Sequence, residues 1–293
     1  MPAMFFETAG ITVPLWLSPL GGFVLAFVGA MVGISGAFLL MPFQMSVLGY
    51  VSPSVSATNL VFNLAAIPSG AWRFVREGRM LWPLAGIVAV GTLPGLLIGW
   101  WLRVYWIQDP RSFKLFVGLV LAYLAMRLLM NLRAGGNKPK PAGALVPLAL
   151  TFRSAEFELG GERFSFDPRR MLLLAAVVGV IGGTYGVGGG AIIAPFCVAL
   201  FGLPVHAVAG AALFAALVTS VFGVAIYSFL PAPTGVVAQP DWALGLLFGA
   251  GGAVGMCFGA RMQKHVPQRA LKLGLALVMA GLAAAYSIQF FVQ

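Results

Sequence analysis

Long uncharged apolar runs alternate with short polar connections along the chain. No charged side chain occurs between Glu7 and Arg73, or between Arg170 and Asp241. Both stretches far exceed the roughly 20 apolar residues that cross a bilayer as one helix. The pattern therefore predicts an all-α polytopic membrane protein. The eight apolar segments that we predict are 17–48, 54–74, 81–102, 112–131, 171–201, 205–230, 241–262 and 270–291.

The second four segments repeat the first four. The stretch GAMVGISGAFLLMPF at Gly29–Phe43 returns as GGTYGVGGGAIIAPF at Gly182–Phe196, 153 positions later. Paired Gly/Pro-interrupted apolar segments in two halves of a membrane protein are typical of a transporter with its binding site at the repeat interface. We predict two tandem membrane repeats, residues 1–132 and 171–293, joined by a soluble linker at 133–170.

The first segment of each repeat is predicted to be a broken or re-entrant helix. It is longer than a single span, and its glycines fall in the middle, at Gly33–Ala37 and Gly186–Gly190. Glycine costs a helix interior about 1 kcal/mol relative to alanine, and proline about 3 kcal/mol. Each such segment is therefore expected to form two half-helices joined by irregular backbone. Backbone of this kind is tolerated at membrane depth only where protein buries it or where it lines a cavity.

The positive charges indicate how the repeats are oriented. The basic connection follows the second segment in the first repeat, around Arg73–Arg79, but follows the third segment in the second repeat, around Arg261–Lys272. If basic connections are cytoplasmic, the repeats are inverted, with three crossings and a re-entrant segment each and both termini outside. Arg103, Arg111 and Lys114 then face outward, against the rule. The alternative is a parallel repeat with four crossings in each half.

The linker predicts a small soluble element. Two partly alternating runs, 150–159 and 162–167, flank Gly160–Gly161, which is typical of a β-hairpin. A surface element or dimer contact is the favoured interpretation, and a regulatory module is the alternative. A homodimer is also one interpretation of the Gly-x-x-x-Gly pairs that begin at Gly95 and Gly255; the other is packing within the chain.

Composition narrows the function classes. Hydrophobic residues make up 60% of the chain and charged residues only 9%, against about 25% charged in soluble domains. The net charge of +10 lies at segment ends and in the linker, which favours lipid headgroups over nucleic acid as the partner. No carboxylate lies within an apolar segment, and no metal-ligand spacing or nucleophile set occurs. We predict no enzyme, no metal and no cofactor.

A negatively charged substrate must then be held without a salt bridge. The free N–H groups and the dipole at a half-helix N-terminus form an anion site that needs no formal charge. We therefore expect the backbone of the glycine loops to contact a small anion near the middle of the membrane. The loop residues assigned to this site are Gly33, Gly36, Gly186, Gly188 and Gly189.

Polar side chains near the loops extend the predicted site. Ser35 lies in the first loop, Tyr185 lies beside the second, and Thr58, Asn59 and Asn63 lie early in the second segment. For each of these side chains the alternative is a hydrogen bond that joins packed helices. His206 is a candidate for proton coupling because histidine titrates near neutral pH; the alternative is a capping role at the start of its helix.

These motifs resemble the sulfite exporter TauE/SafE family. The resemblance rests on the duplicated glycine stretch, on the Ser-Ala-Thr-Asn motif at Ser56–Asn59 and on the paired glycines near Gly95 and Gly255. It implies a multi-pass secondary transporter of the bacterial inner membrane, an exporter of sulfite, sulfoacetate, other sulfonates or related small anions, working by alternating access. A passive anion channel and an assembly factor that transports nothing are the alternatives.

Overall fold

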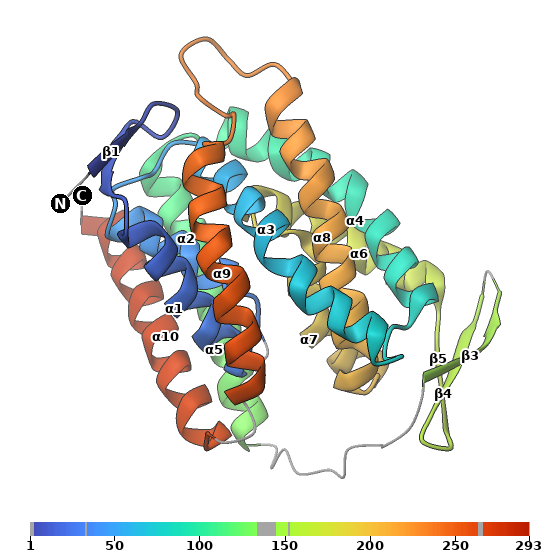
Figure 1. Ribbon diagram of the computed structural model, residues 1–293. Coiled ribbons are helices and arrows are strands. Elements are labelled where there is room, and N and C mark those ends of the chain that lie inside the picture. The colour runs from blue at the N-terminus through green and yellow to red at the C-terminus, as the bar shows by residue number, and fades with distance from the viewer. Residues whose placement is uncertain (1–2, 33, 134–144, 152, 263–265, 293) are drawn as a thin grey trace.

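The computed structural model describes residues 3–32, 34–133, 145–151, 153–262 and 266–292, and it is mostly helical (Figure 1). The predicted apolar segments all appear as helices with ends close to the expected ones. The helices are α1 (Leu17–Val32), α2 (Ala37–Ser46), α3 (Ser54–Arg76), α4 (Trp82–Trp101) with the π-helical turn η1 (Leu102–Trp106), α5 (Pro110–Arg133), α6 (Pro168–Tyr185), α7 (Gly189–Phe201), α8 (Val205–Phe229), α9 (Trp242–Met262) and α10 (Gln268–Val292).

Both predicted helix breaks are confirmed. The first apolar segment divides into α1 and α2, and the fifth divides into α6 and α7. At the second break Gly186 and Gly188 have φ angles of 81° and 77°, a region that residues with a Cβ rarely adopt. Glycine is therefore what allows the chain to leave α6 and start α7 within three residues.

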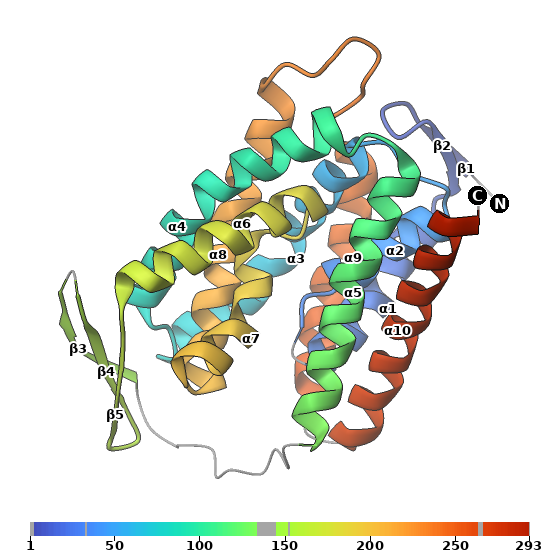
Figure 2. The ribbon, with the colours of Figure 1, turned by 180° about the vertical axis from the view of Figure 1, so that it is seen from behind.

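Two small sheets lie at the edges of the helical body. The predicted hairpin at Gly160–Gly161 is confirmed as β4 (Ala155–Leu159) paired with β5 (Glu162–Phe166), and β3 (Leu145–Leu150) adds a third antiparallel strand. An N-terminal hairpin of β1 (Ala3–Phe6) and β2 (Ile11–Pro14) was not predicted. The β3–β5 sheet lies on the opposite side of the molecule from the two termini (Figures 1 and 2).

The two halves of the chain are interlocked. Helix α1 packs along α9 from the other half, α6 packs along α4, and α3 packs against both α8 and α9. The paired glycines create these contacts, since a Cβ on Gly95 would lie 2.0 Å from the Ala176 carbonyl oxygen and one on Gly255 would lie 2.2 Å from that of Phe23. The Gly-x-x-x-Gly pairs of α4 and α9 therefore serve packing within the chain.

Helices in corresponding positions run in opposite directions. In Figure 1, α3, α5 and α9 run downward, whereas α8, α10 and α4 run upward. The α3–α4 connection, the end of α5, the end of α9 and the start of α10 thus lie at one end of the molecule. Five helical stretches among the described residues are long and apolar enough to cross a membrane: Trp82–Trp106, Pro110–Met130, Ala207–Phe229, Trp242–Met262 and Arg269–Val292.

Candidate functional site

A polar stripe on α3 faces the second helix break. Ser56, Asn59 and Asn63 are spaced three and four residues apart, which places them on one face of the helix, and each is completely buried. The Ser56 hydroxyl donates to the Thr184 carbonyl at 3.0 Å, and the Asn63 amide donates to the Val187 carbonyl at 2.8 Å. The stripe thus supplies donors to carbonyl groups that the end of α6 leaves without helical partners.

Asn59 connects the two helix breaks. Its Nδ2 donates to the Ala37 carbonyl at 3.1 Å, at the start of α2, and to the Gly186 carbonyl at 3.0 Å, beyond the end of α6. Two carbonyl acceptors fix the orientation of this amide, because only its nitrogen can donate. The Tyr185 hydroxyl adds a second link by donating to the Phe38 carbonyl at 3.0 Å. The broken segments of the two halves therefore meet at one buried place.

The donors predicted to bind an anion are used by the protein in this conformation. Both N–H bonds of the Asn59 amide go to carbonyls, while the Oδ1 atoms of Asn59 and Asn63 are buried without hydrogen-bond partners. An unpartnered amide oxygen accepts a hydrogen and repels an anion. Contact between these amides and an anion would require the amide to leave its carbonyl partners.

The second glycine loop is closely packed. A Cβ on Gly186 would lie 2.2 Å from the Ser56 carbonyl oxygen, and one on Gly188 would lie 2.9 Å from the Thr219 hydroxyl. A Cβ on Gly189 would lie 2.6 Å from Cγ2 of Thr92. All residues from Gly182 to Gly190 are buried. The loop glycines assigned to the site thus lie where α3, α4 and α8 converge, and in this conformation the loop is closed to solvent.

The first loop is capped by its own serine. The Ser35 hydroxyl accepts a 3.3 Å hydrogen bond from the Ala37 N–H, one of the first donors of α2. Gly36 lies against α1, and a Cβ there would be 2.6 Å from the Ala26 α-carbon. Gly33, also assigned to the site, lies outside the described residues. Ser35 therefore occupies one N–H group at the start of α2 in this conformation, and its contact with an anion stays a prediction.

A buried arginine adjoins this site, and the sequence analysis missed it. The positive-inside rule predicts that Arg103 of η1 is one of the charges facing outward, but its side chain is completely buried. Its Nε donates to the Ser56 hydroxyl at 3.4 Å, its Nη2 donates to the Val51 carbonyl at 3.1 Å, and its Nη1 donates to the Ile107 carbonyl. The guanidinium also lies over the Phe113 ring, 3.7 Å from the centroid.

The charge of Arg103 has no acidic partner among the described residues. The ion pairs found there are Arg73–Glu77, Arg79–Glu77 and Arg170–Asp167. A guanidinium has five N–H groups, and the three bonds above use only one on each nitrogen. Arg103 lies near the end of the stretch Trp82–Trp106, which is long and apolar enough to cross a membrane, and an ionisable side chain buried in such a stretch without a countercharge is costly and usually marks a functional site. The available clue in the sequence was a lone arginine inside an apolar, aromatic run, Trp100–Trp106.

Thr58 lies apart from the helix breaks. Its hydroxyl accepts from the Asp241 N–H at 2.9 Å and is 2.9 Å from the Tyr50 hydroxyl. The Asp241 carboxylate is itself nearly buried and accepts from the N–H groups of Leu244, at 2.9 Å, and Ala9, at 3.2 Å. Thr58 thus joins α3 to the start of α9, and the structure does not bring it together with the glycine loops.

The side chain of His206 lies outside the described residues, so its role in proton coupling stays a prediction.

On the exposed α3–α4 connection, Arg73 and Arg79 donate to the Glu77 carboxylate at 2.7 and 3.0 Å. These hydrogen bonds, that of Arg73 first, lower the pKa of Glu77 from its ordinary value. This basic connection is satisfied at the surface and takes no part in the buried site.

The fold and the buried site describe a multi-pass membrane protein in which two broken helices meet inside the helical body. The family model "Sulfite exporter TauE/SafE" matches residues 19–286, and the chain belongs to this family. A relative, the "Probable membrane transporter protein YunE" of Bacillus subtilis (strain 168), is 22% identical over 274 residues, which cover 88% of this chain and 93% of the relative. No solved structure matches the chain significantly.

Membership in this family makes the protein a multi-pass membrane transporter, in agreement with the predicted class. It confirms the resemblance inferred from the duplicated glycine stretch.

Proposed function

We propose that the protein is a secondary transporter of the bacterial inner membrane that exports small sulfur-containing anions, sulfite or sulfonates such as sulfoacetate. The anion binds between the two helix breaks and is carried by alternating access. The family name supports a sulfur oxyanion as cargo. Such an anion is small and permanently charged, and its oxygens accept several hydrogen bonds at once.

The observation that carries this proposal is the buried, unpaired charge of Arg103. One hydroxyl, that of Ser56, contacts both the Arg103 guanidinium and the Thr184 carbonyl beside the second break. An anion near the break would supply the countercharge that the protein lacks there. Hydrogen bonds to an ionised guanidinium are about twice as strong as neutral ones. The backbone N–H groups at the start of α7 would complete the site, joined by that of Ala37 at the start of α2 once Ser35 releases it.

Closure of the site supports the alternating-access part of the proposal. The residues that join the two breaks are buried, and Asn59 holds the start of α2 against the end of α6. Such an arrangement suits an occluded state of a carrier. Access from one side would require the amide to release its carbonyls, which also frees it to donate to the anion.

The opposite directions of corresponding helices support inverted repeats. Helices α3 and α8 run in opposite directions, as do α4 and α9 (Figure 1). The packing is also equivalent in the two repeats: α1 lies along α9, and α6, which corresponds to α1, lies along α4, which corresponds to α9. Two inverted repeats, residues 1–132 and 171–293, can exchange their conformations around a central site, which gives two equivalent access states.

The test is sulfite flux in proteoliposomes that contain the purified protein or its Arg103→Gln variant. The intact protein is expected to show saturable uptake and counterflow. Arg103→Gln should reduce uptake at least tenfold, because hydrogen bonds to a charged group contribute about 1.5–3 kcal/mol. Arg111→Gln, at an exposed position beyond η1, is the matched control and should transport normally.

Three results would contradict the proposal. Flux that rises linearly with concentration would indicate a channel. An absence of flux for sulfite and sulfoacetate in protein that is monodisperse would indicate an assembly factor. Normal uptake by folded Arg103→Gln would remove this residue from the anion path.

A further inference from the structure

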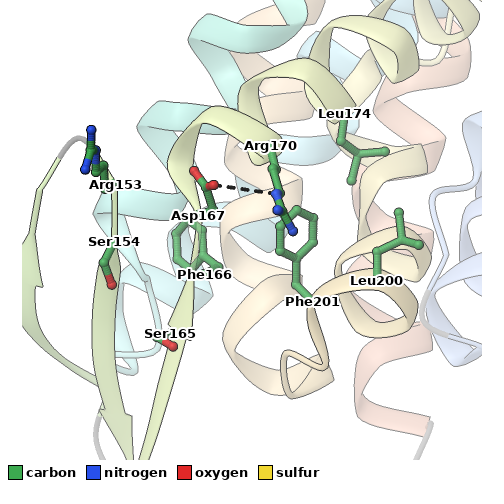
Figure 3. A pocket seen from close by; sticks show the side chains of 9 residues that line it. All are labelled: Arg153, Ser154, Ser165, Phe166, Asp167, Arg170, Leu174, Leu200 and Phe201. Atoms are coloured by element: carbon green, nitrogen blue, oxygen red, sulfur yellow. Dashed lines mark ion pairs between the residues drawn. The ribbon is translucent and has the colours of Figure 1, made fainter.

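A cavity lies where the soluble β3–β5 sheet meets the membrane helices, at the ends of α6 and α7 that are away from the helix break. Its volume is about 610 Å³. Figure 3 shows its lining, to which the sheet, the start of α6 and the end of α7 all contribute. The residues that line it are Arg153, Ser154, Ser165, Phe166, Asp167, Arg170, Leu174, Leu200 and Phe201.

The lining has a polar part and an apolar part. The sheet contributes Arg153 and two serines, whereas α6 and α7 contribute Leu174, Leu200 and Phe201. Figure 3 shows Arg170 on α6, where its side chain forms an ion pair with Asp167. A cavity with charge on one wall and hydrocarbon on the other matches a molecule that has a polar head and an apolar tail.

The sign of the charge in the cavity is positive. Arg153 and Arg170 line it, and the opposing acid is Asp167. The Asp167 carboxylate is already engaged, because Oδ1 accepts from the Arg169 N–H at 2.9 Å and Oδ2 lies 3.6 Å from the Arg170 Nε. The Arg170 side chain remains 81% exposed, so its terminal N–H groups are accessible. The polar wall therefore favours an anionic head.

The cavity opens at the level where the membrane begins. Helix α6 starts at Pro168, and after Arg170 the chain carries no charge until Asp241. Beside the cavity, Leu173 and Leu200 are 70% and 66% exposed, as expected for side chains that contact lipid. Arginines at the end of such a helix lie among the headgroups. The apolar wall is thus continuous with the lipid-facing surface.

We propose that this cavity binds an anionic phospholipid. Its phosphate lies between Arg153 and Arg170, its glycerol contacts the two serines, and the first carbons of an acyl chain lie along Leu174 and Leu200. A lipid fits better than a free oxyanion, because an ion would leave the hydrophobic wall in contact with water. The sheet thereby acquires a function: it supplies Arg153 and closes the headgroup end of a lipid site.

Native mass spectrometry of the full-length protein tests the proposal with phosphatidylglycerol and phosphatidylcholine as probes. One phosphatidylglycerol molecule is expected to remain bound under conditions that remove phosphatidylcholine. A basic side chain near anionic lipid contributes about fivefold in affinity, so Arg153→Gln should weaken retention about fivefold and Arg153→Gln with Arg170→Gln about 25-fold. Arg163→Gln, at an exposed position of the same sheet outside the cavity, is the matched control and should leave retention unchanged.

Arg153→Gln alone keeps the test decisive if the double variant does not fold, since Arg153 lies in the exposed turn between β3 and β4. Equal retention of both lipids, or unchanged phosphatidylglycerol retention in folded Arg153→Gln, would overturn the proposal. Displacement of the lipid by millimolar inorganic phosphate alone would also overturn it, by showing a site for a free ion. Transport of sulfite is not needed for any of these readouts, so failure here is distinct from failure of the proposed transport.

Discussion

Helices α3 and α8 occupy corresponding positions in the two halves but contact the helix breaks in different ways. Asn59 and Asn63 of α3 correspond, 153 positions on, to Ala212 and Ala216 of α8. The asparagines hold the second break by hydrogen bonds to Gly186 and Val187. The alanines instead allow close backbone contact, since a Cβ on Gly190 would lie 2.2 Å from the Ala216 nitrogen and 2.3 Å from the Ala212 carbonyl oxygen.

The two repeats therefore place corresponding helices beside the second break but use different side chains there. The two asparagine amides lie on α3, together with Arg103 that contacts Ser56, whereas the α8 hydroxyls near the loop, those of Thr219 and Ser220, donate to carbonyls of α8 itself. Helix α8 presents small side chains there and determines how closely α7 can approach. A site built this way is asymmetric even if its two halves are inverted copies, and the two helices should respond differently to mutation.

The largest effect is expected on the α8 side. Gly190→Ala would place a methyl group within about 2.3 Å of two backbone atoms of α8, a separation that only movement of α7 can relieve. Because neither backbone can move easily, the loss in the free energy of unfolding should exceed the roughly 1–3 kcal/mol typical of overpacking. Loss of the monodisperse peak in size-exclusion chromatography would show this effect.

Gly281→Ala is the matched control for that change. Gly281 lies in α10, exposed, with no atom within 4 Å of an added Cβ. Alanine should stabilise the helix by up to about 1 kcal/mol. A Gly190→Ala protein that unfolds at the same temperature as Gly281→Ala would show that α7 and α8 are not in close contact.

An intermediate effect is expected on the α3 side. Asn59→Ala leaves the buried carbonyls of Ala37 and Gly186 without this donor, which should destabilise the protein by about 1–3 kcal/mol. Sulfite uptake should fall by a larger factor than stability explains, because the amide is also a proposed anion contact. Thermal unfolding and proteoliposome uptake, measured on the same preparation, separate the two effects.

Ser69→Ala is the control on the same helix. Ser69 donates only to the Ala66 carbonyl, three residues earlier, so its loss should change stability by about 0.5 kcal/mol or less. If Asn59→Ala matched Ser69→Ala in both stability and uptake, the polar stripe would have no special role, and α3 and α8 would be equivalent.

The smallest effect is expected at the start of α8. His206 occupies the position that corresponds to Pro53, which precedes α3, so only the second half has a titratable group there. If His206 couples protons, His206→Gln should abolish the pH dependence of uptake between about pH 5 and 8 while leaving the protein folded. An unchanged pH profile would assign it to capping.

The broken helices were predictable from sequence because their cause is local. Glycine clusters disfavour a helix wherever they occur, and the positive φ angles of Gly186 and Gly188 follow from the same property. The meeting of the two breaks was also expected from the repeat. The N-terminal hairpin was missed because four-residue strands carry too little pattern to distinguish them from the flank of a membrane segment.

The side-chain roles were less predictable because they depend on packing. Arg103 is buried only because η1 extends α4 beyond the predicted end and because α5 places Phe113 under the guanidinium. Thr58 is one residue from Asn59, yet one position rotates a side chain by about 100° around a helix, toward Asp241 and away from the breaks. Sequence also could not show that the Asn59 donors are bound to carbonyls.

The double hydrogen bond of Asn59 has a consequence for turnover. One Nδ2 atom holds carbonyls from both halves, so separating either broken segment strains the contact of the other. The hydrogen bonds of Asn59 to Ala37 and to Gly186 would then break together in a single activated step. Because both hydrogen bonds break in that one step, the rate of anion exchange should rise steeply with temperature.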